Sequence, residues 1–263
     1  MKKYKAHAKV NIFLKITGRR NKYHEIVSRF VKITDLYDEL FFVPKERVAA
    51  KENEFKIIGD FDCMMHENTI YKAYVALKEA TASEALENLM RNYAIVVEKK
   101  IPAFAGLGGG SSDAATYLKM CNEVLHLGLS LNELAKIGLH VGADVAFFIY
   151  GYESANVSGI GEVVEIFEEE PMAFDIYTPA IQISTPQVYK AYRENFYNPI
   201  DGFEAKSLKQ KSSLEVLSEL DAKEANDLFA PALQEYADLA QHYKEGYYFS
   251  GSGSSFFKIK EEK

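Results

Sequence analysis

The sequence is poor in cysteine and proline and contains no tryptophan. Its two cysteines, Cys63 and Cys121, are too few for a disulfide framework or a cysteine-based metal cluster. None of the six histidines has zinc-ligand spacing to another. Cys121 falls on the apolar face of a predicted helix, so we interpret it as a reduced thiol in the core. These absences exclude a fold that depends on disulfide bonds or structural zinc sites for its stability.

Long apolar runs and excess positive charge are also missing. No stretch reaches the length of a membrane span, and alternating residues, not an apolar segment, follow the basic residues at the N-terminus. The 31 Lys and Arg residues against 38 Asp and Glu residues give a net charge of −7. Such a surface has no general attraction for nucleic acid or an anionic membrane. We therefore expect a cytoplasmic protein of the size of an enzyme, with no nucleic-acid or membrane partner.

What the sequence does contain is a glycine-rich stretch over residues 101–115, with four glycines within five positions. A predicted strand precedes it and a predicted amphipathic helix follows it. Free N–H groups and the helix dipole attract anions at a helix start, and glycines let phosphate oxygens approach the backbone. The stretch favours a nucleotide-phosphate site over a linker or an ordinary turn. It is no P-loop, because Ser111 follows Gly110 where that motif needs lysine, and it matches the dinucleotide fingerprint poorly.

The remaining pattern mixes strands and helices without repeats. Alternation predicts a half-buried strand over 6–17, with Lys9 and Asn11 on its polar face. Other strands are predicted near 26–33, 39–43, 95–97, 174–184, 247–249 and 256–259. Helices are predicted to start at Asn68 or Thr69, at Ser112, at Ser130 through a capping box, at Thr185, and near 214 and 231. We expect hairpin or loop over 44–60 and 198–213, and an α+β protein of two lobes with a junction near 155.

Two separated residues have the chemistry that phosphoryl transfer to an alcohol requires. A carboxylate must accept the hydroxyl proton and a cation must lie near the transferred group. Asp144 and Lys9 would supply both, although a helix-capping aspartate and a solvated lysine are the alternatives. Tyr23 and His24 follow a turn and would suit a planar ligand, or simply end a hairpin. Likewise, the loop over 250–255 either links two strands of a hairpin or forms a second glycine-rich edge of the predicted phosphate site.

Three blocks, in family order along nearly the whole chain, resemble the motifs of the GHMP kinases (galactokinase, homoserine kinase, mevalonate kinase and phosphomevalonate kinase). They are Ala6–Asn11, Gly106–Ser112 and Gly251–Ser254. Further blocks are similar to the branch that acts on cytidine diphosphate methylerythritol in non-mevalonate isoprenoid biosynthesis: Lys9–Leu14, Ile16–Arg20, Tyr23–Glu25, Gly142–Val145 and Thr185–Pro186. The resemblance implies a two-lobe GHMP kinase fold. Its N-terminal, ATP-binding lobe (1–155) would resemble domain 2 of ribosomal protein S5, and its C-terminal lobe (156–263) would be ferredoxin-like.

The same resemblance implies roles for individual residues. Asp144 would remove the proton of the substrate's 2-hydroxyl, while Lys9 keeps Asp144 ionised and stabilises the γ-phosphoryl group. Tyr23 and Tyr189 would stack on the two faces of the cytosine ring, and His24 would recognise its edge. Asn11 and Asp144 would face the erythritol. ATP contacts are implied for Asn68, Lys99, Pro102, Gly106, Leu107, Gly108, Gly109, Gly110, Ser111 and Ser112. Mg²⁺ is expected to accompany ATP, with Ser112 as its nearest ligand.

The chain also departs from the family pattern. His7 and Ala146 stand where prolines are usual, and the turn before Tyr23 is one residue short and lacks its glycine. The chain stops soon after the third block, so we expect a shortened C-terminal lobe. Two other functions are considered: a GHMP kinase of the homoserine or mevalonate type, and a nucleotide-binding regulator without catalysis. We expect a monomer or a weak homodimer.

Overall fold

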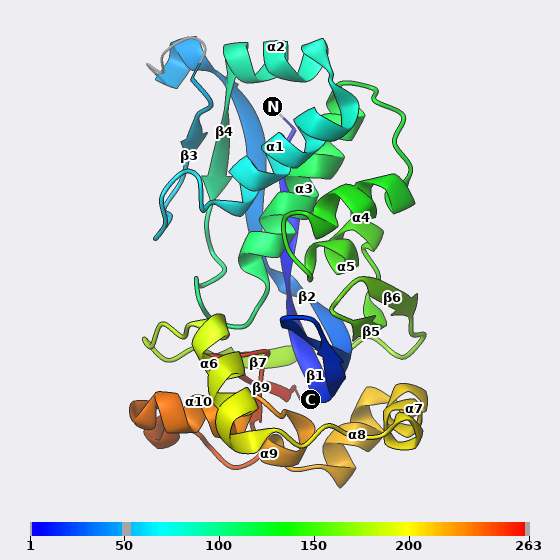
Figure 1. Cartoon of the computed structure of the whole chain (residues 1–263). Helices are drawn as coiled ribbons and strands as arrows, with labels where there is room; N and C mark the ends of the chain where they lie inside the picture. Colours follow the sequence, from blue (N-terminus) through cyan, green and yellow to red (C-terminus); the bar gives the residue numbers. More distant parts are fainter. Residues whose placement is uncertain (1, 49–53, 261–263) are drawn as a thin grey trace. The chain divides into compact units, whose positions relative to one another are not determined.

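The computed structural model describes residues 2–48 and 54–260 and divides the chain into two compact units (Figure 1). Unit 1 consists of Met1–Ala8, Asp35–Ala103 and Gly109–Gly151. Unit 2 consists of Lys9–Thr34, Phe104–Gly108 and Tyr152–Lys263. Two long strands, β1 (Tyr4–Arg20) and β2 (Tyr23–Pro44), pair with each other and contribute residues to both units.

Unit 1 combines a small sheet with five helices. The second half of β2 runs antiparallel to β4 (Tyr93–Glu98), and β3 (Ile57–Ile58) runs parallel to β4. The helices are α1 (Thr69–Thr81), α2 (Glu84–Asn92), α3 (Gly109–Val124), α4 (Leu131–Leu139) and α5 (Val145–Tyr150). In Figure 1, α1 and α3 lie side by side, and α5 packs on both α3 and α4. The glycine-rich stretch thus runs into the first turns of α3, a helix with many buried residues.

The helix starts of unit 1 follow from local hydrogen bonds that the sequence indicates. The Asn68 side chain accepts from the Ile70 amide at the start of α1, and Ser130 forms a capping box with Glu133 at the start of α4. Both predicted starts are confirmed. Cys121 is a free thiol in the core, and burial raises its pKa to about 12, so it is an inert core residue as expected.

Unit 2 contains two sheets. The first half of β2 runs antiparallel to β5 (Ser154–Gly159), which pairs with β6 (Val163–Ile166). The second sheet has the antiparallel order β7 (Phe174–Tyr177), β9 (Phe256–Ile259), β8 (Tyr248–Phe249). The helices are α6 (Thr185–Ala191), α7 (Gly202–Gln210), α8 (Ser213–Glu219), α9 (Ala222–Ala225) and α10 (Phe229–Glu235), with a π turn over Tyr192–Phe196 and a 3-10 turn over Ala237–His242. Phe229, Phe249 and Phe256 pack ring against ring in its core.

Several sequence predictions are wrong in instructive ways. The strands predicted at 26–33 and 39–43 are one continuous β2, because no glycine or proline interrupts the chain between them. The strand over 6–17 is not half-buried: Lys9, Asn11 and Phe13 are as buried as the apolar face. The expected loop over 198–213 contains α7, whose start is capped by Asp201. Within 44–60 the described residues form a 3-10 turn (Lys45–Val48) and β3, while residues 49–53 lie outside the description.

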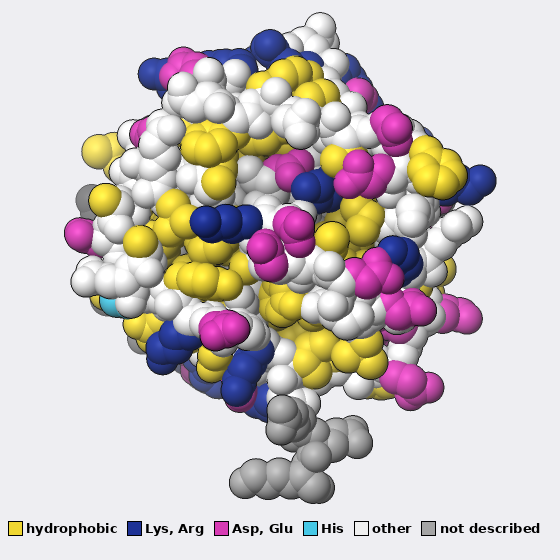
Figure 2. All heavy atoms as spheres, turned by 90° about the horizontal axis from the view of Figure 1, so that it is seen from below, with side chains coloured by type: hydrophobic (Ala, Val, Ile, Leu, Met, Phe, Trp, Pro, Cys, Tyr) yellow, Lys and Arg dark blue, Asp and Glu magenta, His cyan; other side chains and the backbone are white. Residues whose placement is uncertain are grey.

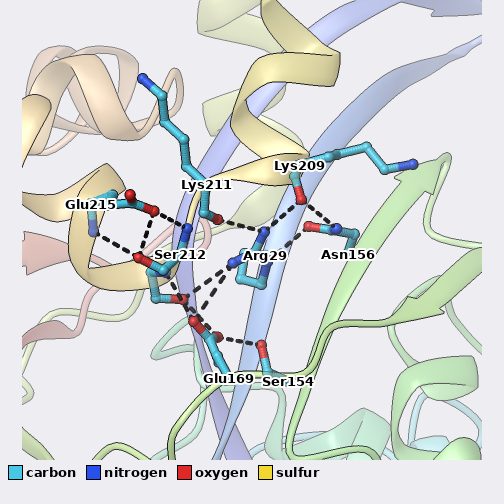
Figure 3. Close-up of polar contacts among 9 residues, drawn as sticks. Arg29, Ser154, Asn156, Glu169, Lys209, Lys211, Ser212 and Glu215 are labelled. Atoms are coloured by element: carbon cyan, nitrogen blue, oxygen red, sulfur yellow. Dashed lines mark hydrogen bonds and ion pairs between the residues drawn. The ribbon is translucent and has the colours of Figure 1, made fainter.

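Arg29 on β2 is wholly buried and holds four segments of unit 2 together (Figure 3). Its guanidinium donates to Asn156 Oδ1 on β5 at 2.8 Å and to the carbonyl oxygens of Lys209 and Lys211 at 3.0 and 3.1 Å. The ring of Phe167 lies 3.4 Å from its central carbon, and Glu169 is its carboxylate neighbour at 3.8 Å. This cluster fixes the end of α7 against the sheet that β2 and β5 form.

The surface agrees with the charge balance of the chain. Figure 2 shows acidic and basic side chains interspersed on one face, with hydrophobic side chains between them and no continuous basic patch among the residues described there. Phe203 on α7 is the most exposed of the large hydrophobic side chains, at 84%. Within residues 2–48 and 54–260, no helix is both long and apolar enough to span a membrane.

Candidate active site

Lys9 is a buried lysine at the centre of the candidate site in unit 2. Its side chain is 3% exposed, and its Nζ donates to Asn11 Oδ1 at 2.5 Å and to the carbonyl oxygen of Gly106 at 3.0 Å. The ammonium also lies 4.6 Å from the centre of the Phe30 ring. Lys9 and Asn11 share a face because side chains two apart on a strand point the same way. Lys9 and Asn11, which were predicted to share one face of the strand, are therefore in contact.

The glycine loop and the last loop of the chain pack on each other beside Lys9. Ser250 Oγ donates to the Gly106 carbonyl oxygen at 3.0 Å, and the Ser255 amide donates to the Ala105 oxygen at 3.1 Å. A Cβ on Gly106, which has φ +72°, would clash with the Ser250 carbonyl oxygen. The loop over 250–255 is therefore packed against the glycine stretch and is more than a hairpin linker. All three resembling blocks meet here.

The glycine stretch continues into unit 1 as the first turn of α3. Thr69 Oγ1 donates to the Gly110 carbonyl oxygen at 2.6 Å, and a Cβ on Gly109 would come within 2.9 Å of the Ile101 side chain. Gly109 thus allows close packing within the unit. The amides at the start of this 16-residue helix have no partner inside the helix, which suits an anion.

Asp144 occupies the N-cap position of α5 in the same unit, but its side chain forms no capping hydrogen bond to the helix. The preceding turn lies near the start of α3, because a Cβ on Gly142 would be 3.7 Å from Ser111 Oγ. Helices α3 and α5 also pack together. The structure therefore brings the turn that carries Asp144 close to Ser111 of the glycine stretch, and a purely helix-capping role for Asp144 is not supported.

Lys99, an expected ATP contact, lies between two buried carboxylates that the sequence analysis did not single out. Its Nζ is 2.5 Å from Asp38 Oδ2 and 2.8 Å from Asp113 Oδ2. Asp38 also accepts from the amides of Lys100 and Ile101, and so connects the second half of β2 to the chain that enters the glycine stretch. Burial, together with Asp38, raises the pKa of Asp113 to about 7 although Lys99 opposes the rise.

An aromatic cluster surrounds His24 in unit 2. The His24 and Tyr189 rings stack with centroids 5.2 Å apart and planes at 23°, and Tyr192 meets His24 edge-on. Tyr23, by contrast, is 52% exposed. Burial lowers the pKa of His24, and the charges of Arg19 and Arg193 lower it further, so its imidazole is neutral at pH 7. Its buried Nε2 has no hydrogen-bond partner within residues 2–48 and 54–260.

The other expected ATP contacts have local roles. Asn68 caps α1, Leu107 is buried and accepts from the Lys9 amide at 3.0 Å, and Ser112 is buried in α3. Pro102 is exposed just before the glycines. The residues that sequence reasoning missed are Ser28, Phe30, Asp38 and Asp113. Only Asp113, within the glycine-rich stretch, carried a local signal; Ser28, Phe30 and Asp38 lie on β2, where their contacts depend on pairing with distant segments.

Comparison with known proteins identifies relatives along the whole chain. Residues 68–152 match the family described as "GHMP kinases N terminal domain". A protein of Sulfurimonas denitrificans named 4-diphosphocytidyl-2-C-methyl-D-erythritol kinase is 66% identical over 265 residues, which cover 100% of this chain and 98% of that protein. A protein of the same name from Sulfurovum sp. is 42% identical over 259 residues, covering 97% of this chain and 98% of that one.

Solved structures give the same assignment of the fold. A crystal structure of a 4-(cytidine 5'-diphospho)-2C-methyl-D-erythritol kinase matches with a TM-score of 0.72 and 29% identity, over 99% of this chain and 90% of that one. The mevalonate kinase of Methanococcus jannaschii matches with a TM-score of 0.58 and 14% identity, over 99% of this chain and 90% of that chain. The similarity to the mevalonate kinase concerns the fold alone. The predicted α+β GHMP kinase fold is confirmed.

Proposed function

The chain belongs to the family of 4-diphosphocytidyl-2-C-methyl-D-erythritol kinases within the GHMP kinases, and we propose that it transfers the γ-phosphoryl group of ATP to the 2-hydroxyl of 4-diphosphocytidyl-2-C-methyl-D-erythritol. The product would serve non-mevalonate isoprenoid biosynthesis. The observation that carries this proposal is the buried Lys9, which contacts the glycine loop and lies where the three GHMP-like blocks meet. A regulator without catalysis would not need a lysine held in this way.

In the proposed reaction, Asp144 and Lys9 perform the two charge-related tasks. Asp144 accepts the proton of the 2-hydroxyl while the hydroxyl oxygen attacks the γ-phosphorus. The bond between that phosphorus and the bridging oxygen of ADP breaks. Lys9 stabilises the negative charge that the transferred group and its neighbours carry. Burial strengthens the action of the Lys9 ammonium because fewer water molecules screen it.

The aromatic cluster around His24 supports recognition of a cytidyl group. A neutral imidazole offers one donor and one acceptor, so it suits the edge of cytosine, which also presents both. A ligand edge would satisfy the buried His24 Nε2. Tyr189 and the exposed Tyr23 are the rings that we assign to the two faces of the base, and Asn11 to the erythritol. Because Tyr189 stacks on His24 here, binding of the base between two tyrosines requires these rings to rearrange.

The glycine stretch supports binding of ATP phosphates at the start of α3. Its free amides and the helix dipole favour a polyanion, and Gly106, Leu107, Gly108, Gly109, Gly110, Ser111 and Ser112 are the proposed contacts. Asn68, Lys99 and Pro102 remain proposed contacts to the nucleoside. No group of three or more His, Cys, Asp or Glu side chains in the described part of the chain could hold a metal by itself. Mg²⁺, which would neutralise phosphate charge, fits as an ion that enters with ATP and meets Ser112.

The remaining expectations are part of the same proposal. The division into functional lobes at 1–155 and 156–263 stays a prediction, as do the cytoplasmic location and the monomeric or weakly dimeric state. The homoserine-type and mevalonate-type alternatives are not favoured, because relatives 66% and 42% identical bear the name of the cytidyl kinase.

Asp144→Asn tests the proposed reaction. Without a base, kcat with ATP and the cytidyl substrate should fall about 10²- to 10⁴-fold. ATP binding, followed by calorimetry with a nonhydrolysable analogue, should change little because the base does not contact the nucleotide. The matched control is Asp175→Asn, which alters an exposed carboxylate on β7 and should retain wild-type turnover. Near-normal turnover of Asp144→Asn would reject the assignment of the base.

A further inference from the structure

Ser28 forms the far end of a buried hydrogen-bond chain that begins at Lys9. Asn11, whose Oδ1 accepts from Lys9, donates through Nδ2 to Ser28 Oγ at 2.9 Å. The Ser28 hydroxyl in turn donates to the carbonyl oxygen of Phe13. Ser28 is 0% exposed and Asn11 is 1% exposed, so water does not compete for these bonds. The chain connects β1, which carries Lys9, to β2, which carries Ser28.

The two ends of this chain determine its direction. A lysine ammonium can only donate, and a backbone carbonyl oxygen can only accept. Ser28 has one hydroxyl proton, which is used on the Phe13 oxygen, so its oxygen is left to accept from Asn11. The Asn11 amide must then turn its NH₂ to Ser28 and its oxygen to Lys9. No other arrangement of these four groups satisfies every bond.

We propose that Ser28 is a positioning residue for phosphoryl transfer: it sets the orientation of the Asn11 amide and thereby the position of the Lys9 ammonium. This inference rests on the proposed function, in which Lys9 stabilises the transferred group. Ser28 itself touches neither substrate nor nucleotide. Its hydroxyl acts through Asn11, and it reaches the site through the pairing of β1 with β2, 19 positions from Lys9 in the sequence.

Loss of the hydroxyl removes the acceptor that holds the Asn11 NH₂. The buried amide is then free to rotate toward another acceptor, and rotation by half a turn points the NH₂ at the Lys9 ammonium, donor against donor. The ammonium must move away from that arrangement. A displacement of about 1 Å in a catalytic group can cost about 10²-fold in rate. The chemical step should therefore suffer, whereas binding of ATP, to which Asn11 is assigned no contact, should not.

The test compares Ser28→Ala with Ser28→Thr and with Ser154→Ala. Ser28→Ala should lower kcat by about 10- to 100-fold while the KM for ATP stays within about twofold, and Ser28→Thr, which keeps the hydroxyl, should restore most of kcat. Ser154 is a buried serine on β5 whose hydroxyl bonds Glu169, so its removal matches the loss of a buried hydrogen bond outside the chain. Ser154→Ala should keep wild-type kcat. Equal kcat in Ser28→Ala and Ser154→Ala would overturn the proposal.

A double-mutant cycle separates action through Asn11 from general destabilisation. If Ser28 acts only through Asn11, adding Ser28→Ala to Asn11→Ala should lower kcat by less than about twofold further. Additive losses in kcat would contradict the proposal.

A crystal structure of Ser28→Ala gives a readout that does not depend on the substrate. The Asn11 amide should be rotated or the Lys9–Asn11 bond broken; an unchanged Lys9–Asn11 bond overturns the inference whatever the enzyme phosphorylates. Failure of the proposed function is a different result, namely no turnover of the cytidyl substrate by the wild-type enzyme.

Discussion

Each unit contains a cation in a cluster that is largely shielded from solvent, but Lys99 in unit 1 and Arg29 in unit 2 are balanced in opposite ways. In unit 1, Lys99 lies between two carboxylates, Asp38 and Asp113, so negative charge exceeds positive charge. In unit 2, Arg29 has one carboxylate neighbour among the described residues, Glu169 at 3.8 Å, and otherwise donates to neutral oxygens (Figure 3). The ring of Phe167 packs against its guanidinium. The first cluster is short of positive charge, and the second is short of negative charge.

The pKa values reflect this difference. Two acids share one ammonium in unit 1, so the pKa of Lys99 is raised, and burial together with Asp38 raises that of Asp113 to about 7. In unit 2 burial dominates and lowers the pKa of Arg29 to about 10, with Glu169 opposing the shift. A guanidinium tolerates this environment because its planar fork donates to several carbonyls at once. The comparison shows that a buried cation needs directed acceptors and not necessarily an equal number of anions.

The largest expected effect is that of Lys99→Met. The substitution leaves Asp38 and Asp113 buried without their shared cation, and uncompensated buried charge typically costs about 3–5 kcal/mol. Urea unfolding at pH 8, above the raised pKa of Asp113, should show this loss. Lys100→Met is the matched control, because Lys100 is exposed and pairs loosely with Glu39 at 3.5 Å. Its cost should stay below about 1 kcal/mol, and equal costs for the two variants would contradict the comparison.

Arg29→Lys should have a smaller effect. An ammonium cannot span the carbonyl oxygens of Lys209 and Lys211 together with Asn156, and it loses the planar contact with Phe167. We expect the free energy of unfolding to fall by about 2–3 kcal/mol, since buried acceptors lose their donors. Arg20→Lys, at an exposed site paired with Glu25 and Glu162, is the control and should change stability by less than about 1 kcal/mol. If Arg29→Lys left the free energy of unfolding unchanged, a positive charge alone would be enough to stabilise this cluster, which contradicts the comparison.

The smallest effect concerns the pH dependence of stability. Between pH 4 and 7 the folded protein keeps a proton on Asp113 that the unfolded chain has released, so this group makes stability fall as pH rises through that window. Asp113→Asn removes the titration and leaves Lys99 paired with Asp38. The loss of unfolding free energy between pH 5 and pH 8 should therefore be smaller in Asp113→Asn than in the wild type. Asp175→Asn should keep the wild-type slope; identical slopes in all three proteins would show that Asp113 ionises normally.

Much of the fold could be predicted because its signals are local. The caps at Asn68 and Ser130, the alternation of β1 and the helix after the glycines all depend on residues within a few positions of one another. The α7 helix was missed although Asp201 caps its start, because its sequence has little apolar periodicity. The division of β2 into two strands was wrong because the strand continues through the exposed polar residues near Asp35.

The sequence by itself determined the three motif blocks, the candidate pair Lys9 and Asp144 and the membership of a kinase family, because these depend on residue identity and order. Only the tertiary structure decided that Lys9 and Asn11 are buried, that the last loop packs on Gly106, and that Asn11 donates a hydrogen bond to Ser28. The physical reason is that these contacts join residues from 17 to 144 positions apart. Strand pairing and loop packing, not local propensity, bring such residues within hydrogen-bond distance.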